Sequence, residues 1–136
     1  MPEARHQNEV VIRAFTACTE HYANGGYHVF VDGVIGPWHF DPWLELAGKG
    51  LSVDYVILRP DQQTTVDRAA ARAAGGALVD RDVVAAMWAQ FAGLNDYESN
   101  VVDTTGQSVD RSLEAVRAAI ADGRTRIAKR RTVEST

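Results

Sequence analysis

Residues 27–37 read "YHVFVDGVIGP", which joins an aromatic and β-branched run to a single carboxylate and a glycine-rich exit. Residues 27–35 are apolar at both odd and even positions for most of their length, which is typical of an interior parallel strand. Burying an unpaired carboxylate costs several kcal/mol or forces it to take up a proton. We therefore expect Asp32 at the carboxyl end of this strand, near water or a cation, unless a structural partner holds it.

The rest of the chain alternates predicted helices with predicted strands. Helical periodicity predicts a helix before the first strand, with Val10, Phe15 and Cys18 on its apolar, buried face and its end at "NGG", residues 24–26. Asp41 followed by Pro42 predicts the start of a helix over residues 42–48. Further strands are predicted over residues 51–60 and 99–105. Further helices are expected to begin after the N-caps Asp61, Asp80 and Ser108. The last of these helices is expected to point Val109, Leu113, Val116 and Ile120 inward.

This order predicts an α/β fold with a small, mainly parallel sheet, because strands separated by helices pair in parallel through right-handed crossovers. Open α/β sheets bind ligands beyond the carboxyl ends of their strands. Asp32, Arg59 and the "DTTG" of residues 103–106 all lie at the carboxyl ends of the predicted strands. This edge of the sheet is therefore the predicted ligand site.

Composition limits the classes of protein and partner. The 136 residues have the length of one domain, and 46% hydrophobic with 24% charged residues is ordinary for a globular protein. A net charge of −4 argues against a nucleic-acid partner. The polar N-terminus and the lack of a long apolar run predict no signal peptide and no membrane partner. One cysteine and no metal-ligand spacing among the histidines suit a cytoplasmic protein without a zinc site. Residues 127–136 form a polar, basic tail that we expect to be disordered.

Several polar residues have both a functional and a structural interpretation. A hydrophobic strand ending in Asp32 matches the Walker B pattern, whose carboxylate holds Mg²⁺, but such residues equally often bond a loop. Arg68 and Arg72 lie one helical turn apart and could clamp phosphate oxygens. Spacing alone favours a solvated helix face with Asp67 or Asp61 as a partner.

Three more residues near the predicted strand ends remain open in the same way. Arg59 directly follows a predicted strand and could face the ligand edge, or could equally bond the C-terminus of a neighbouring helix. Trp38 and His39 follow the first strand and could either line a pocket or cover the core. The phosphate-binding pattern G-x-x-x-x-G-K-[ST] is absent from the sequence, because the Gly-Lys in residues 45–52 ends a helix instead of opening one.

Four ordered segments carry a resemblance to a known family. They are "GGYHVFVDGVIGPWHFDPW" (25–43), "VDYVILRPDQQTTVDRAAAR" (53–72), "DVVAAMWAQFAGL" (82–94) and "ESNVVDTTGQSVDRSLEAVRAAI" (98–120). Together they resemble bacterial P-loop kinase-like proteins, often labelled AAA-family ATPases and similar to chloramphenicol phosphotransferase, zeta-toxin and gluconate-kinase-type phosphotransferases. The resemblance runs from about Gln7 to Arg126, is specific for the family and does not identify a substrate. Relative to that family, the chain starts after the strand and Walker A loop.

The resemblance implies a three-layer α/β/α fold, P-loop NTPase-like and truncated at its N-terminus, over residues 1–126. It implies ATP and Mg²⁺ as cofactors, with Asp32 as the metal ligand and residues 73–80 as the crossing of a lid. Arg68 and Arg72 would be the catalytic arginines of that lid, acting with Asp32. The remaining implied positions fall into a nucleotide group of Arg59, Thr104 and Thr105 beside Asp32, and an acceptor-substrate group of Gln7, Asn8, Trp38 and His39.

Two functions follow as expectations. The first is an ATP-dependent small-molecule phosphotransferase domain with little or no activity of its own, since the phosphate cradle and its lysine are missing. The alternative is a non-catalytic α/β interaction module that forms a homodimer through an exposed sheet edge. A different α/β binding domain, using the same strand-end crevice for another small ligand, is a third possibility.

Overall fold

The structure, a computed structural model, describes residues 2–73 and 80–127. These residues are 62% helical and 5% strand, and their sheet has two strands. The expected three-layer α/β/α, P-loop NTPase-like fold is therefore wrong. The chain divides into two compact units, which we call unit 1 (Met1–Val53 and residues from Arg126 onward) and unit 2 (Asp54–Thr125).

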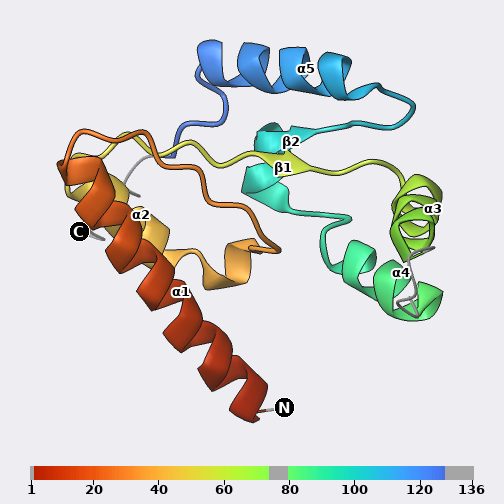
Figure 1. The fold of residues 1–136 in the computed structure, drawn as a ribbon, viewed down its shortest axis with the longest axis horizontal. Helices are drawn as coiled ribbons and strands as arrows, with labels where there is room; N and C mark the ends of the chain where they lie inside the picture. Colours follow the sequence, from red (N-terminus) through yellow and green to blue (C-terminus); the bar gives the residue numbers. More distant parts are fainter. Residues whose placement is uncertain (1, 74–79, 128–136) are drawn as a thin grey trace, which may run out of the picture. The chain divides into compact units, whose positions relative to one another are not determined.

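Unit 1 consists of a long helix, a single 3-10 turn and a short helix. Helix α1 spans Pro2–Asn24 and ends, as expected, at the glycine pair, where Gly26 has a φ of +89°. The turn η1 spans Pro37–His39, and α2 spans Asp41–Gly48 with Phe40, not Asp41, at its N-cap. Helices α1 and α2 pack side by side (Figure 1).

The core of unit 1 is small. It is formed largely by the buried side chains of Phe40, Trp43 and Leu46. At the surface, the Lys49 ammonium lies 2.9 Å from the Glu20 carboxylate and links α1 to the end of α2. Ile127, the first residue of the predicted tail, is buried and donates its backbone N–H to the Val53 carbonyl at 3.0 Å.

The expected strand over residues 27–35 is absent from unit 1. Phe30 is 94% exposed, and Asp32 is exposed as well, so Asp32 does not end a buried strand. A strand satisfies its backbone groups only through a neighbouring strand, and no described strand pairs with these residues. The apolar pattern thus identified a segment suited to a sheet, but not a partner for it.

The apolar face of α1 also differs from expectation. Val10 and Phe15 are about half exposed, at 55% and 51%, and Cys18 is exposed rather than buried. Helical periodicity therefore predicted the helix correctly and its burial incorrectly, because burial depends on what packs against the stripe.

Unit 2 contains the sheet. Strand β1 is Ile57–Leu58 and strand β2 is Val101–Val102, paired in parallel with Ile57 opposite Val101. The Arg59 N–H extends this ladder to the Val102 carbonyl at 3.0 Å. The prediction of parallel pairing is confirmed, whereas the predicted strands over residues 51–60 and 99–105 were too long.

The other regular elements described in unit 2 are helices. They are α3 (Gln62–Arg72), α4 (Arg81–Gln90), the 3-10 helix η3 (Asn95–Asn100) and α5 (Val109–Ala121). The three predicted N-caps are confirmed: Asp61, Asp80 and Ser108 each accept a backbone N–H within the first turn. Helix α3 packs against α4, and α5 lies against β2 (Figure 1).

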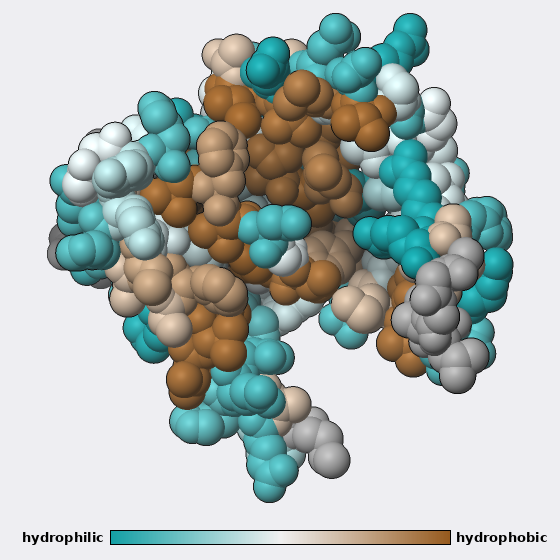
Figure 2. Space-filling view, viewed as in Figure 1, coloured by the Kyte–Doolittle hydropathy of each residue, from teal (hydrophilic) through white to brown (hydrophobic). Residues whose placement is uncertain are grey.

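The expectation that Val109, Leu113, Val116 and Ile120 of α5 all point inward is wrong for three of them. Val109 is 85% exposed and Leu113 is 48% exposed, while Ile120 also remains accessible. Figure 2 shows hydrophobic atoms, in brown, at the surface along one side of α5. The apolar core of unit 2 contains instead the buried side chains of Ile57, Val66, Leu94, Val102 and Ala119.

Within the described part of the chain, no helix is both long and apolar enough to cross a bilayer. Residues 74–79, which carry most of the predicted lid crossing, and residues 128–136 of the predicted tail lie outside the described residues.

Candidate functional site

The carboxyl ends of β1 and β2 carry four of the predicted site residues. Arg59 follows β1, and Thr104 and Thr105 follow β2, while Arg68 reaches the same edge from α3. We call these four residues, together with Asp61 and Asp103, the strand-end cluster. All of it belongs to unit 2.

Arg59 is held by contacts within the protein. Its guanidinium meets the Glu98 carboxylate in a bidentate pair, with both N–O distances at 2.8 Å, and donates to the Phe91 carbonyl at 2.6 Å. The hydrogen bonds with Arg59 lower the pKa of Glu98 to about 2, and the same pair raises the pKa of Arg59. Phe91 is the C-cap of α4, so Arg59 bonds a helix C-terminus, which is one of the two arrangements that the sequence left open.

Arg68 joins α3 to the loop after β2. It donates to the Thr104 hydroxyl at 3.2 Å and to the Thr104 carbonyl at 3.0 Å. Thr104 is buried, whereas Arg68 itself is exposed. The expected local partner Asp67 is instead 3.4 Å from Arg81 of α4.

The two acidic residues of the cluster are fixed by neighbouring backbone N–H groups. Asp61 accepts from the Thr64 N–H at 2.7 Å and Asp103 from the Thr105 N–H at 2.9 Å. The bond from the Thr64 N–H lowers the pKa of the Asp61 carboxyl, and the Thr105 side chain, followed by the Thr105 N–H, lowers the pKa of the Asp103 carboxyl. The Thr105 hydroxyl accepts from the Asp61 N–H at 2.7 Å and so ties the two loops together. Both carboxylates are therefore ionised at neutral pH.

The cluster offers both signs of charge at one edge. The guanidinium groups of Arg59 and Arg68 lie among the carboxylates of Asp61, Asp103 and Glu98, and the pKa of Asp61 responds to both Asp103 and Arg68. Arg72 lies one turn after Arg68 on α3 and is exposed. The arginines of the cluster attract a free anion and its carboxylates repel it. An anion bound to a cation can be attracted by both kinds of group.

Asp32 lies in unit 1, outside this cluster, and its side chain is exposed. Among the residues that the structure describes, no group of three or more His, Cys, Asp or Glu side chains could hold a metal ion. The surroundings of Asp32 therefore do not fit a protein-only Mg²⁺ site, and no chemical step is assigned to a metal there.

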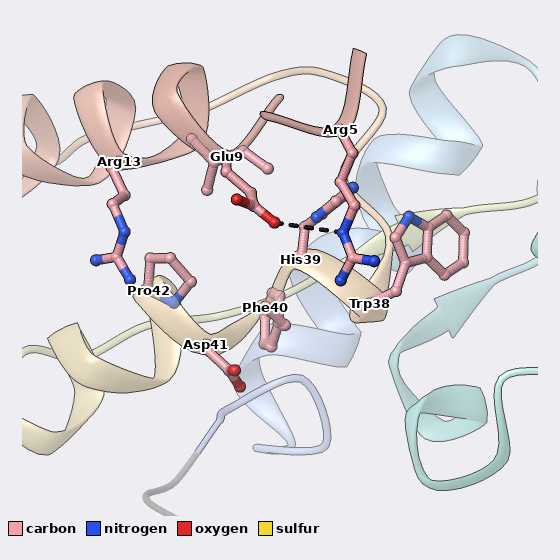
Figure 3. A pocket seen from close by; sticks show the side chains of 9 residues that line it. Arg5, Glu9, Arg13, Trp38, His39, Phe40, Asp41 and Pro42 are labelled. Atoms are coloured by element: carbon pink, nitrogen blue, oxygen red, sulfur yellow. Dashed lines mark hydrogen bonds and ion pairs between the residues drawn. The ribbon is translucent and has the colours of Figure 1, made fainter. Parts of the chain in front are cut away.

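Trp38 and His39 line a cavity of about 330 Å³ within unit 1. Residues 38–42 form one side of this cavity, and four residues of α1 form the other (Figure 3). The α1 residues are Arg5, Glu9, Ile12 and Arg13. We call this the α1–η1 cavity. Gln7 and Asn8, the other predicted acceptor residues, are exposed on α1 and do not belong to its lining.

Sequence reasoning missed Arg5, Glu9 and Arg13. A signal for them does exist, because the three charged residues recur every four positions and so share one face of a helix. The spacing alone is equally typical of a solvated face. Only the packing of residues 38–42 against that face distinguishes the two interpretations.

Comparison of the chain with models of known protein families and with curated proteins found no match in either case.

Proposed function

We propose that the strand-end cluster binds the phosphate groups of a magnesium-bound nucleotide such as ATP. The chain would then contribute the nucleotide side of an ATP-dependent small-molecule phosphotransferase and turn over little or no ATP by itself. The observation that supports this most directly is the convergence of Arg68, Thr104 and Thr105 at the carboxyl ends of two parallel strands.

The charged residues at this edge of unit 2 favour a nucleotide whose phosphates are bound to Mg²⁺. Arg68 and Arg72 on one face of α3 supply bidentate donors for phosphate oxygens. The ionised Asp61 and Asp103 repel a bare polyphosphate, and Mg²⁺ bound to the phosphates offsets that repulsion. The missing phosphate loop accounts for the expected lack of turnover, because phosphoryl transfer depends on positioning and charge neutralisation.

Titration of the full chain with ATP, with and without Mg²⁺, tests the proposal by calorimetry. Binding that requires Mg²⁺ and weakens about tenfold in Arg72→Ala is expected, since a charge-assisted hydrogen bond is lost. Arg72 is exposed, so its removal should leave the fold intact. Arg117→Ala on α5 is the matched control and should bind as the wild type does. No ATP binding under either condition would overturn the proposal, and rapid ATP hydrolysis would contradict the expected lack of turnover.

A second candidate function is self-association as a non-catalytic module. The exposed apolar side chains favour it: Phe30 is 94%, Val109 85% and Val34 71% exposed. Neither β1 nor β2 has a second neighbouring strand among the described residues, so a sheet edge is available as well. Sedimentation equilibrium of the wild type and of the double variant Phe30→Ser/Val34→Ser tests this function. A dimer that the variant weakens supports it, and a monomeric wild type excludes it.

A further inference from the structure

The α1–η1 cavity has the size and the lining of a small-molecule site. Its volume of about 330 Å³ lies near the lower end of ligand pockets, which suits a compound with one or two rings. It is bounded by the long helix α1 and by residues 38–42, all within unit 1. An inference about its ligand therefore does not rest on the nucleotide site proposed for unit 2.

The apolar wall of the cavity presents an aromatic ring. Trp38 is 50% exposed at the edge of the cavity, whereas Phe40 beside it is buried. A β-carbon at Gly36 would overlap the Trp38 indole, so glycine at this position allows the ring to lie where it does. A ring held in this way offers a flat surface against which a second ring can stack.

The polar wall of the cavity carries the guanidinium groups of Arg5 and Arg13, and each of them forms only a weak ion pair within the protein. The Arg5 Nε lies 3.4 Å from Glu9, and the Arg13 Nη1 lies 3.9 Å from Glu45, and all four side chains are more than half exposed. Exposed pairs of this length contribute little energy, so a ligand anion can compete for either arginine. Figure 3 shows Arg5 next to Trp38 and Arg13 beside Pro42.

We propose that the α1–η1 cavity binds a small planar aromatic molecule that carries a carboxylate or a phosphate. Its ring stacks on Trp38 and its acidic group pairs with Arg5, which lies next to that ring, while Arg13 adds a second positive charge at the other end of the cavity (Figure 3). Glu9 and Asp41 also line the cavity, and they set a competing preference for a cation. We expect the cavity to prefer an anionic ligand over a cation, because the ion pairs of both arginines are weak and each guanidinium retains donors for a bidentate bond.

Matched probes separate these preferences. Benzoate, phenyl phosphate, neutral benzamide and cationic benzamidine share one ring and differ in charge. Titration of the ¹⁵N-labelled full chain by NMR gives an affinity and a location for each. We expect benzoate or phenyl phosphate to bind most tightly and to shift signals of α1 and residues 38–42. Comparison of the two acids shows whether the site favours a carboxylate or a phosphate.

Variants on α1 assign the acidic group. Arg5→Gln should weaken binding of the preferred acid by about tenfold, through loss of a charge-assisted bond, and Arg13→Gln should weaken it less, through loss of a more distant positive charge. Glu9→Gln should tighten binding, since it removes the carboxylate that competes for Arg5. Gly36→Ala should weaken binding by displacing the Trp38 ring, and Arg117→Gln on α5 should change nothing.

Three results would overturn the proposal. They are no binding by any probe, tighter binding of benzamidine than of either acid, and unchanged affinity for the acids in both arginine variants. The arginines are exposed on α1, so circular dichroism should show undiminished helix in these variants. None of these results bears on ATP binding, which is measured with a different ligand.

Discussion

The Arg59 guanidinium and the Glu98 carboxylate form a bidentate ion pair that joins three elements of unit 2. Arg59 follows β1, Glu98 lies in η3 immediately before β2, and the same guanidinium also binds the C-cap carbonyl of α4. Glu98 additionally accepts the Leu94 N–H at 2.9 Å. Because β1 and β2 are each two residues long, this pair supplements a ladder that has few hydrogen bonds of its own.

The Arg59–Glu98 pair predicts a loss of stability in acid. The pKa of Glu98 is about 2 in the fold, against 4.5 in a model peptide, so between these values the unfolded chain binds more protons. The stabilisation is therefore present above about pH 5 and is lost as the pH falls towards 2. Urea unfolding of unit 2 between pH 7 and pH 2.5 should show this decline.

Glu98→Gln tests the origin of that acid sensitivity. The variant should be less stable than the wild type at pH 7 and should lose less stability on acidification. The free energy of unfolding of Glu98→Gln should still fall somewhat with decreasing pH, because the pKa values of Asp61 and Asp103 are lowered as well. Glu114→Gln, a substitution at an exposed position of α5, serves as the control. Equal pH slopes in the wild type and Glu98→Gln would contradict the assignment.

Local signals in the sequence predicted the local structure well. Asp61, Asp80 and Ser108 cap their helices as expected, because capping requires only a side chain and the next few backbone N–H groups. Parallel pairing of β1 with β2 was also predictable, from the helices that separate them. Arg59 was predicted to lie at the strand end, with a helix C-terminus as one of its two possible partners.

Features that depend on distant partners were not predictable in the same way. The apolar pattern of residues 27–35 favours a strand, yet no described strand bonds to it, and Phe30 remains exposed. Sheet formation is set by cross-strand neighbours more than by the segment itself. The charged repeat of Arg5, Glu9 and Arg13 is visible in the sequence, but its cavity depends on residues 38–42, about 25 or more positions away.

Two tryptophans differ in whether their indole N–H groups are satisfied. The Trp88 Nε1 donates to the Pro60 carbonyl at 2.8 Å, whereas the buried Trp43 Nε1 has no hydrogen-bond partner among residues 2–73 and 80–127. Trp88→Phe should cost about 1–2 kcal/mol, through the lost bond and some packing. Trp43→Phe should stay within about 1 kcal/mol of the wild type, because removal of an unpaired buried donor offsets the lost area.

Hydrogen exchange of backbone amides, measured in urea, gives a free energy of unfolding for each unit. It therefore reports the destabilisation by Trp43→Phe and by Trp88→Phe separately. A larger cost for Trp43→Phe than for Trp88→Phe would mean that packing outweighs the unpaired N–H group. Far-ultraviolet circular dichroism of both variants checks that helix content is unchanged.

Tyr55 predicts a loss of stability in base. Burial, with a smaller contribution from Tyr97, raises the pKa of Tyr55 to about 12, and its ring meets that of Tyr97 edge to face at 5.9 Å. Between pH 10 and 12 the unfolded chain gives up the phenol proton first, so alkali favours unfolding. Absorbance at about 295 nm should show one late-titrating tyrosine that is missing in Tyr55→Phe. Tyr22→Phe, in an exposed position of unit 1, should leave that late step in place.

Asn100 joins the segment before β1 to the segment after α5. Asn100 is 5% exposed, and its side-chain amide donates to the Tyr55 carbonyl at 2.8 Å and to the Thr125 carbonyl at 3.2 Å. Asn100→Ala should cost about 2 kcal/mol, because it leaves these two carbonyls without the amide donor.

Asn100→Asp should cost more than Asn100→Ala at pH 7, since it turns a buried carboxylate towards two carbonyl oxygens. Below about pH 4 the difference between the two variants should shrink, because a protonated carboxyl regains one donor. Asn95→Gly in the same 3-10 helix is the control. Asn95 is exposed and has a φ of +50°, which glycine adopts readily, so the variant should unfold within about 0.5 kcal/mol of the wild type. Denaturation at pH 7 and pH 3.5 compares all three variants. Equal costs for the alanine and aspartate substitutions at both pH values would contradict the predicted penalty for the buried charge, and a cost near zero for Asn100→Ala would show that the amide donor does not stabilise this junction.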